Sequence, residues 1–99
     1  RDKLILYMKT VSSRDQYWEE IEDLIYDDPS LTNLYIQLWG KINARSVKKT
    51  LKELGLHGYY FGIYDDTVIA SAETKKALES KLHQMLQGDD IESIYIFKV

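Results

Sequence analysis

Three pairs of adjacent aspartates are the feature of this sequence whose residue types could do chemistry. Carboxylate oxygens gathered from several loops can bind a divalent cation such as Ca²⁺, or meet a basic surface of another protein. Aspartate is also common in turns, because its side chain accepts hydrogen bonds from nearby backbone amides. The sequence therefore predicts either one acidic site or three separate turns, formed by Asp27 and Asp28, Asp65 and Asp66, and Asp89 and Asp90.

The remaining patterns give little support to catalysis. His57 and His83 are the two histidines, and neither has a metal-binding spacing. No serine lies in a nucleophile-elbow context, and no glycine-rich motif for phosphate is present. We therefore expect no catalytic residues, no cofactor and no metal. An enzyme with an oxygen-ligated metal ranks below two binding functions described below.

Length and composition indicate one folded unit. The 99 residues, 44% of them hydrophobic, can bury a core, and we predict a single α/β domain over residues 1–99. The absence of cysteine excludes disulfides and fits a reducing compartment, so we expect the cytoplasm. No apolar run reaches the roughly 20 residues of a membrane span, and we expect no membrane partner. The formal net charge of -3 gives no overall attraction to nucleic acid.

The first half of the chain contains patterns of two strands and two helices. Residues 4–8 form an apolar run of strand length. Ser13 stands three residues before Gln16, a capping-box spacing, and predicts a helix of about 14 residues that Pro29 must end. Residues 34–39 alternate with period two, which is typical of a strand. A second helix follows in residues 43–55 and ends at Gly55.

The second half predicts a hairpin, a helix and a final strand. If Asp65 and Asp66 form a two-residue loop, Tyr64 faces Thr67. The apolar residues then share one face in the pairs Ile63 with Val68, Phe61 with Ala70, and Tyr59 with Ala72. Residues 78–86 carry a helical stripe of Leu78, Leu82 and Leu86, and residues 91–99 form an apolar strand.

This order of elements predicts an α+β fold, a two-layer α/β sandwich that is a ferredoxin-like variant with one inserted helix. In that fold the three aspartate pairs would lie at one end of the sheet as an acidic rim. The segment IYDDTVIASAETKKALESKL, residues 63–82, resembles the hairpin-then-helix ending of small prokaryotic α/β proteins. These include antitoxins with a partial double-stranded-RNA-binding-domain fold. The resemblance implies a hairpin followed by a helix.

Two sets of residues are candidates for partner binding. The outer face of the predicted sheet would carry Tyr35, Trp39, Tyr60 and Tyr64, more aromatic surface than a monomer usually exposes. The helix in residues 43–55 has a basic side formed by Arg45, Lys48, Lys49 and Lys52.

These surfaces favour a small protein-interaction module of the immunity, inhibitor or viral accessory type. We expect it to be a homodimer or to bind another protein, because the helix before Pro29 is acidic and could pair with the basic helix of a second copy. The alternative is a single-stranded nucleic-acid binder in which the basic helix contacts phosphates and the tyrosines stack on bases.

Overall fold

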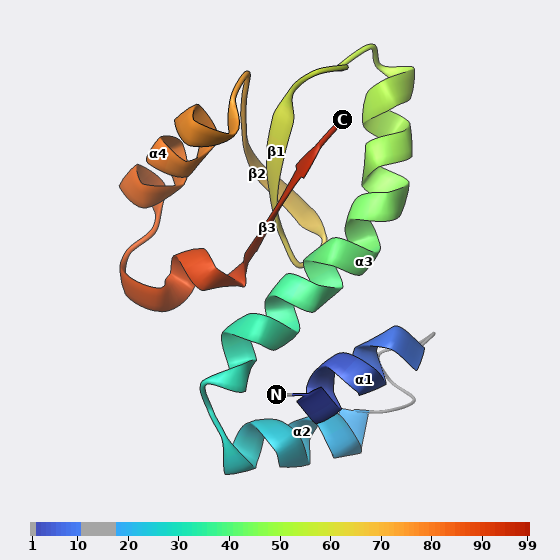
Figure 1. Ribbon diagram of the computed structural model, residues 1–99, viewed down its shortest axis with the longest axis vertical. Coiled ribbons are helices and arrows are strands. Elements are labelled where there is room, and N and C mark those ends of the chain that lie inside the picture. The colour runs from blue at the N-terminus through green and yellow to red at the C-terminus, as the bar shows by residue number, and fades with distance from the viewer. Residues whose placement is uncertain (1, 11–17) are drawn as a thin grey trace.

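The computed structural model describes residues 2–10 and 18–99 as a helix-rich α+β fold (Figure 1). The elements of this part of the chain, in order, are α1 (Asp2–Thr10), α2 (Trp18–Asp27), α3 (Leu31–Glu53), β1 (Tyr60–Tyr64), β2 (Thr67–Ala72), α4 (Lys75–Met85), the 3₁₀ helix η2 (Gly88–Ser93) and β3 (Ile94–Lys98). The strands form one antiparallel sheet in the order β2-β1-β3.

The sheet lies between two helices (Figure 1). Phe61 and Phe97, whose ring centroids are 5.9 Å apart, pack in one cluster with Ala44 of α3. On the other face Ala72 and Ile94 pack with two fully buried leucines of α4, Leu78 and Leu82. Both faces are thus partly covered, which makes three layers rather than two.

Helix α3 joins the two parts of the molecule. Its C-terminal half packs on the sheet, while its N-terminal half extends past the sheet and packs against α1 and α2 (Figure 1). The Cα radius of gyration is 14.3 Å, and the extents are 39 × 30 × 18 Å. A compact domain of this length has a radius of about 13 Å, so the molecule is elongated along this helix.

Local signals define both ends of α3. Ser30 is the N-cap residue of α3, and the Asp28 carboxylate accepts hydrogen bonds from its backbone amide and hydroxyl; Pro29 lies just before the helix. At the other end Gly55 has a φ of 80°. The Leu56 amide donates to the Leu51 carbonyl and the Gly55 amide to that of Lys52, which is a Schellman motif. The predicted stop at Gly55 is confirmed.

The ferredoxin-like prediction is wrong, because two of its strands are helical. Residues 4–8 belong to α1: Leu4 and Met8, four residues apart, are buried, whereas Leu6 is 65% exposed. A strand would have placed these three side chains on one face. A short apolar run does not distinguish a strand from a buried helix by its periodicity.

Residues 34–39 lie inside α3 rather than in a strand. Tyr35 and Trp39 face the helical cluster with α1 and α2, while Gln37 donates from its side chain to the Ile94 carbonyl, 3.3 Å away. This part of α3 is covered on two sides, so apolar residues surround most of it. The period-two alternation of residues 34–39 therefore does not indicate a strand, and the predicted strand is wrong.

The hairpin is confirmed at its turn and wrong beyond it. Tyr64 pairs with Thr67, and Ile63 with Val68, as expected for a loop of Asp65 and Asp66. A β-bulge then shifts the register, so the predicted pairs of Phe61 with Ala70 and Tyr59 with Ala72 do not form. The pairs are instead Phe61 with Ser71, Gly62 with Ala70, and Tyr60 with Ala72. The bulge at Ile69 moves the alanines of β2 to the α4 face.

The remaining predictions are mostly confirmed. Helix α2 ends at Asp27, before Pro29, although the capping box of Ser13 and Gln16 lies outside the described residues. Helix α4 follows the hairpin, and its N-cap is Thr74, whose hydroxyl accepts a hydrogen bond from the Ala77 amide. The final strand is shorter than residues 91–99, because η2 occupies its first part.

Candidate functional site

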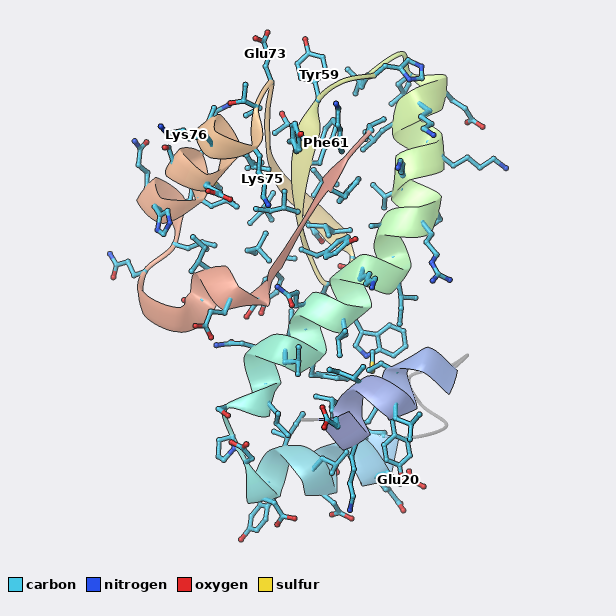
Figure 2. The ribbon with its side chains drawn as sticks, in the orientation of Figure 1. Glu20, Tyr59, Phe61, Glu73, Lys75 and Lys76 are labelled. Carbon is cyan, nitrogen blue, oxygen red and sulfur yellow. The ribbon has the colours of Figure 1, made fainter. Side chains whose placement is uncertain are left out.

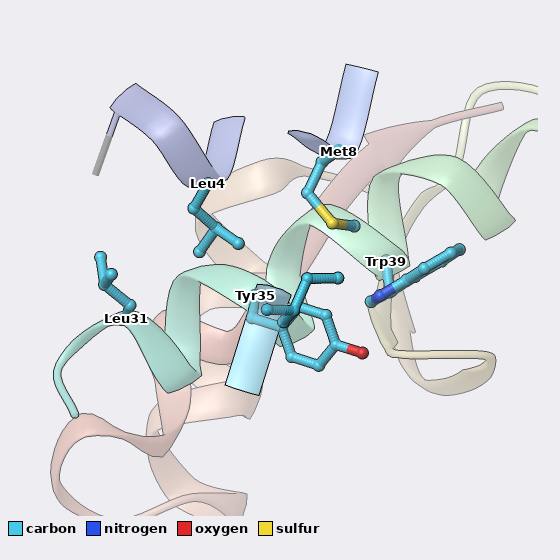
Figure 3. Packing of buried hydrophobic residues seen from close by; sticks show 6 residues of the cluster. Leu4, Met8, Leu31, Tyr35 and Trp39 are labelled. Atoms are coloured by element: carbon cyan, nitrogen blue, oxygen red, sulfur yellow. The ribbon is translucent and has the colours of Figure 1, made fainter. Parts of the chain in front are cut away.

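Tyr35 and Trp39, two of the predicted partner-binding aromatics, lie in the core of the helical part. Each is 7% exposed, and both pack with Leu4, Met8 and Leu31 (Figure 3). The two rings meet edge to face, with centroids 6.4 Å apart. They therefore do not belong to an outer sheet face.

Tyr60 and Tyr64 lie on the side of the sheet that faces α4. Tyr60 is half-buried, and the Lys98 ammonium lies 5.7 Å from its ring centroid, a cation–π contact. Tyr64 is 43% exposed at the end of β1. The α3 helix covers the opposite face, so these tyrosines and the basic residues of α3 do not form one surface.

The four predicted cations do come together. Arg45, Lys48, Lys49 and Lys52 lie on the solvent side of the C-terminal half of α3, where Lys48 is half-buried and the other three are exposed. Lys41 extends the group by one turn. The binding of a partner by these residues stays a prediction.

The aspartate pairs do not form one rim. Asp28 lies just before the N-terminus of α3, whereas the Asp65 carbonyl accepts a hydrogen bond of 2.8 Å from the Asn43 side chain in the middle of that helix. From Leu31 to Asn43 the helix rises about 18 Å. In residues 2–10 and 18–99 no group of three or more histidine, aspartate or glutamate side chains is placed to hold a metal ion.

A groove lies between α2 and the N-terminal half of α3. Its volume is about 580 Å³. Its lining is mostly apolar and comes from Trp18, Glu22, Asp23, Ile25 and Tyr26 of α2 and from Thr32, Tyr35 and Ile36 of α3.

The groove is lined by the packed rings of Trp18 and Tyr35, and Tyr26 lies at its open edge. The Trp18 and Tyr35 rings are tilted by 54° with centroids 6.0 Å apart, and Trp18 remains 42% exposed. Tyr26 is 87% exposed, although it is a large apolar residue on a packed helix. Because the edge is open, a small molecule would leave much of its own surface wet, whereas a helix or extended segment could cover both rings.

The groove is bordered by negative charge. Glu22 and Asp23 line it, and α2 has no basic residue. Glu19 and Glu20 in the first turn complement the helix dipole, but Asp27 at the C-terminal end opposes it. Helix stability therefore does not account for the whole acidic set.

Of the residues that line the groove, only Tyr35 was among the partner-binding residues predicted from the sequence, and it was assigned there to a sheet face. The acidity of α2 was evident, but the groove depends on α3 continuing as a helix past residues 34–39. One signal was available. Tyr26 follows Ile25 and so lies about 100° away from it around the helix, outside the stripe of Ile21, Leu24 and Ile25 that packs inward.

The two carboxylates that line the groove, those of Glu22 and Asp23, are exposed, and the lining residues that the structure describes include no histidine or lysine. None of the helices described here is both long and apolar enough to cross a membrane.

Comparison with known proteins gave no relative. No protein-family model, no curated protein and no solved structure matches the chain.

Proposed function

We propose that this chain is a protein-interaction module that binds, in the groove between α2 and α3, an amphipathic segment of another protein. The single observation that carries the proposal is an apolar groove with two exposed aromatic rings and an acidic border on one helix. Exposed aromatics that can become buried are typical anchors of protein interfaces. We place this function in the cytoplasm, which the cysteine-free composition favours.

The chemistry of the groove defines the partner. Trp18, Tyr26 and Ile36 favour apolar or aromatic anchors at helical spacing, as in helix-in-groove recognition. Glu22 and Asp23 favour lysine or arginine beside those anchors, and complementary charge raises both the association rate and the specificity. The proposed ligand is therefore a basic amphipathic helix.

A second copy of the chain fits the groove less well. The basic part of α3 would supply the charge, but the exposed residues of that helix from Lys41 to Glu53 are all polar or charged. Such a surface has no side chain to fill an apolar groove. The homodimer predicted from the sequence remains a prediction, and the partner we propose is a different protein.

Selection of peptides from a random display library tests this function. We expect the selected peptides to combine apolar anchors with lysine or arginine, and to lose binding to the variant Glu22→Lys with Asp23→Lys. Selection of acidic peptides, or of none, would contradict the proposal. So would a concentration-dependent dimer that Tyr26→Ala abolishes, because the groove would then hold a second copy.

A further inference from the structure

The basic face of α3, formed by Lys41, Arg45, Lys48, Lys49 and Lys52, is a second surface, independent of the groove. Its first and last residues are 11 positions apart, which is about 16 Å along a helix. Within the described residues none of these five side chains has an ion pair or a hydrogen bond to another side chain. Their charge is therefore not neutralised inside the molecule.

The stability of α3 does not explain this arrangement. Lys52 lies in the last turn, where a cation complements the helix dipole, but that effect fades within one turn and does not reach Lys41 or Arg45. Lys41 and Arg45, and also Lys48 and Lys52, are like charges four residues apart, an arrangement that destabilises a helix. The repulsion between these cations lowers the stability of the helix unless an anion binds to the basic face.

The shape of the surface distinguishes between possible anions. The apolar side of this part of α3 is not available to a partner, because Ala44, Val47 and Leu51 pack on the sheet. An interfacial helix needs an apolar side to enter a membrane, and a protein interface needs an apolar centre. A regular row of cations without apolar neighbours is instead what phosphate groups of a nucleic-acid backbone require.

We propose that the basic face of α3 binds the phosphate backbone of a nucleic-acid duplex. Single strands are usually held on stacking aromatic rings beside the cations, and Tyr60 and Tyr64 lie on the other face of the sheet from α3. The basic face therefore favours a duplex, whose phosphates are regularly spaced, over a single strand. Acidic α2, which carries Glu20, lies at the far end of the molecule from Tyr59 and Glu73 (Figure 2), away from the C-terminal end of α3.

The salt dependence of binding to a labelled DNA duplex of about 20 base pairs measures the contacts. With three to five phosphates neutralised, log K should fall against log salt with a slope of about -2.7 to -4.5. The variant Lys48→Gln with Lys49→Gln should weaken binding and make the slope shallower by about 1.8. This variant removes like-charge neighbours and should fold at least as well as the unaltered protein, which a thermal melt will verify.

The matched control is Lys75→Gln with Lys76→Gln, which removes the same charge from two adjacent exposed lysines of α4 (Figure 2). We expect it to change the slope little, and the groove variant Tyr26→Ala to leave duplex binding unchanged, which keeps this test separate from the proposed function. Four results would overturn the proposal: no duplex binding at low salt, equal losses in both double variants, tighter binding of the single strand, or equal binding of polyglutamate or phosphatidylserine vesicles.

Discussion

Gly40 lies where α3 packs closely against the sheet. A Cβ atom at this position would lie 3.2 Å from the Tyr95 Cβ, 3.2 Å from the Ile63 Cγ2 and 3.4 Å from the Ile63 carbonyl oxygen. The Tyr95 Cβ and the carbonyl are fixed to the backbone of the sheet, so they cannot move aside as the end of a flexible side chain would. The lack of a side chain at Gly40 allows α3 to cross the sheet at this distance.

Gly40→Ala should therefore destabilise the fold. Alanine favours a helix over glycine by about 1 kcal/mol, but overpacking a core costs about 1–3 kcal/mol, so we expect a net loss of up to about 2 kcal/mol. Urea unfolding measures it. A stability gain of the size that helix propensity alone predicts would show that the layers can separate without cost.

Asp28 gives a prediction of pH dependence. The hydrogen bond from the Ser30 hydroxyl, together with that from the Ser30 amide, holds the pKa of Asp28 below its ordinary value of 3.8. A carboxyl whose pKa is lower in the folded state contributes stability above its unfolded pKa and loses that contribution as the pH falls through its folded pKa. The contribution should thus be complete at neutral pH and absent in strong acid.

The variant Asp28→Asn isolates this charge, because the asparagine side chain keeps an oxygen that can accept the hydrogen bonds from Ser30. The melting temperature of the unaltered protein should exceed that of the variant near neutral pH, and the difference should vanish in strong acid, as the pH falls through the lowered pKa of Asp28. A difference that stays constant across this range would mean that the charge of Asp28 does not contribute through ionisation.

At the scale of elements, the types of most elements in the second half of the chain could be predicted from the sequence, whereas two helical segments of the first half were predicted as strands. In the hairpin and α4, turn residues, caps and periodicity act over a few residues: Asp65 takes a φ of 56° at the turn, and Thr74 caps α4. In α3 the identity of residues 34–39 depends on α1, α2 and β3, which are distant in sequence. Tertiary contacts, rather than local sequence preference, determine that residues 34–39 are helical.

The bulge in β2 has the same origin. Local alternation placed Ala70 and Ala72 on the face of Phe61, but packing against α4 needs them on the other face. One extra residue at Ile69 changes the face without changing the turn. The strand wrongly predicted in residues 34–39 and the wrong hairpin register did not affect the predicted basic side of α3, because residues 45–52 are helical both in the prediction and in the structure.

Leu82 tests how α4 is attached to the sheet. It is fully buried, it belongs to the cluster with Leu78, Ala72 and Ile94, and its methyl groups lie 3.5 Å from where a Gly62 Cβ would be. Leu82→Ala should cost about 2–5 kcal/mol of unfolding free energy, because the sheet backbone cannot collapse into the cavity. Chemical denaturation gives this value directly. The exposed residue Met85 serves as the control, and Met85→Ala should change stability little.

At the scale of the whole molecule, the charges are separated along α3. Residues 18–30 contain six acidic and no basic residues, Glu19, Glu20, Glu22, Asp23, Asp27 and Asp28, whereas the C-terminal half of α3 carries the basic face. The net charge of -3 hides this separation. A module of this kind can bind two partners of opposite charge at its two ends, each by one of the surfaces proposed above.

The affinity of a selected basic amphipathic peptide for matched tyrosine variants is the most direct test of the groove. Tyr26→Ala removes an exposed ring from the groove, and Tyr59→Ala removes one, 38% exposed, from the far end of the molecule. We predict that Kd rises at least about tenfold for Tyr26→Ala and stays within about twofold for Tyr59→Ala, as expected when one ring is an interface anchor. Equal Kd values for both variants and the unaltered protein would contradict the assignment of the groove as the binding site.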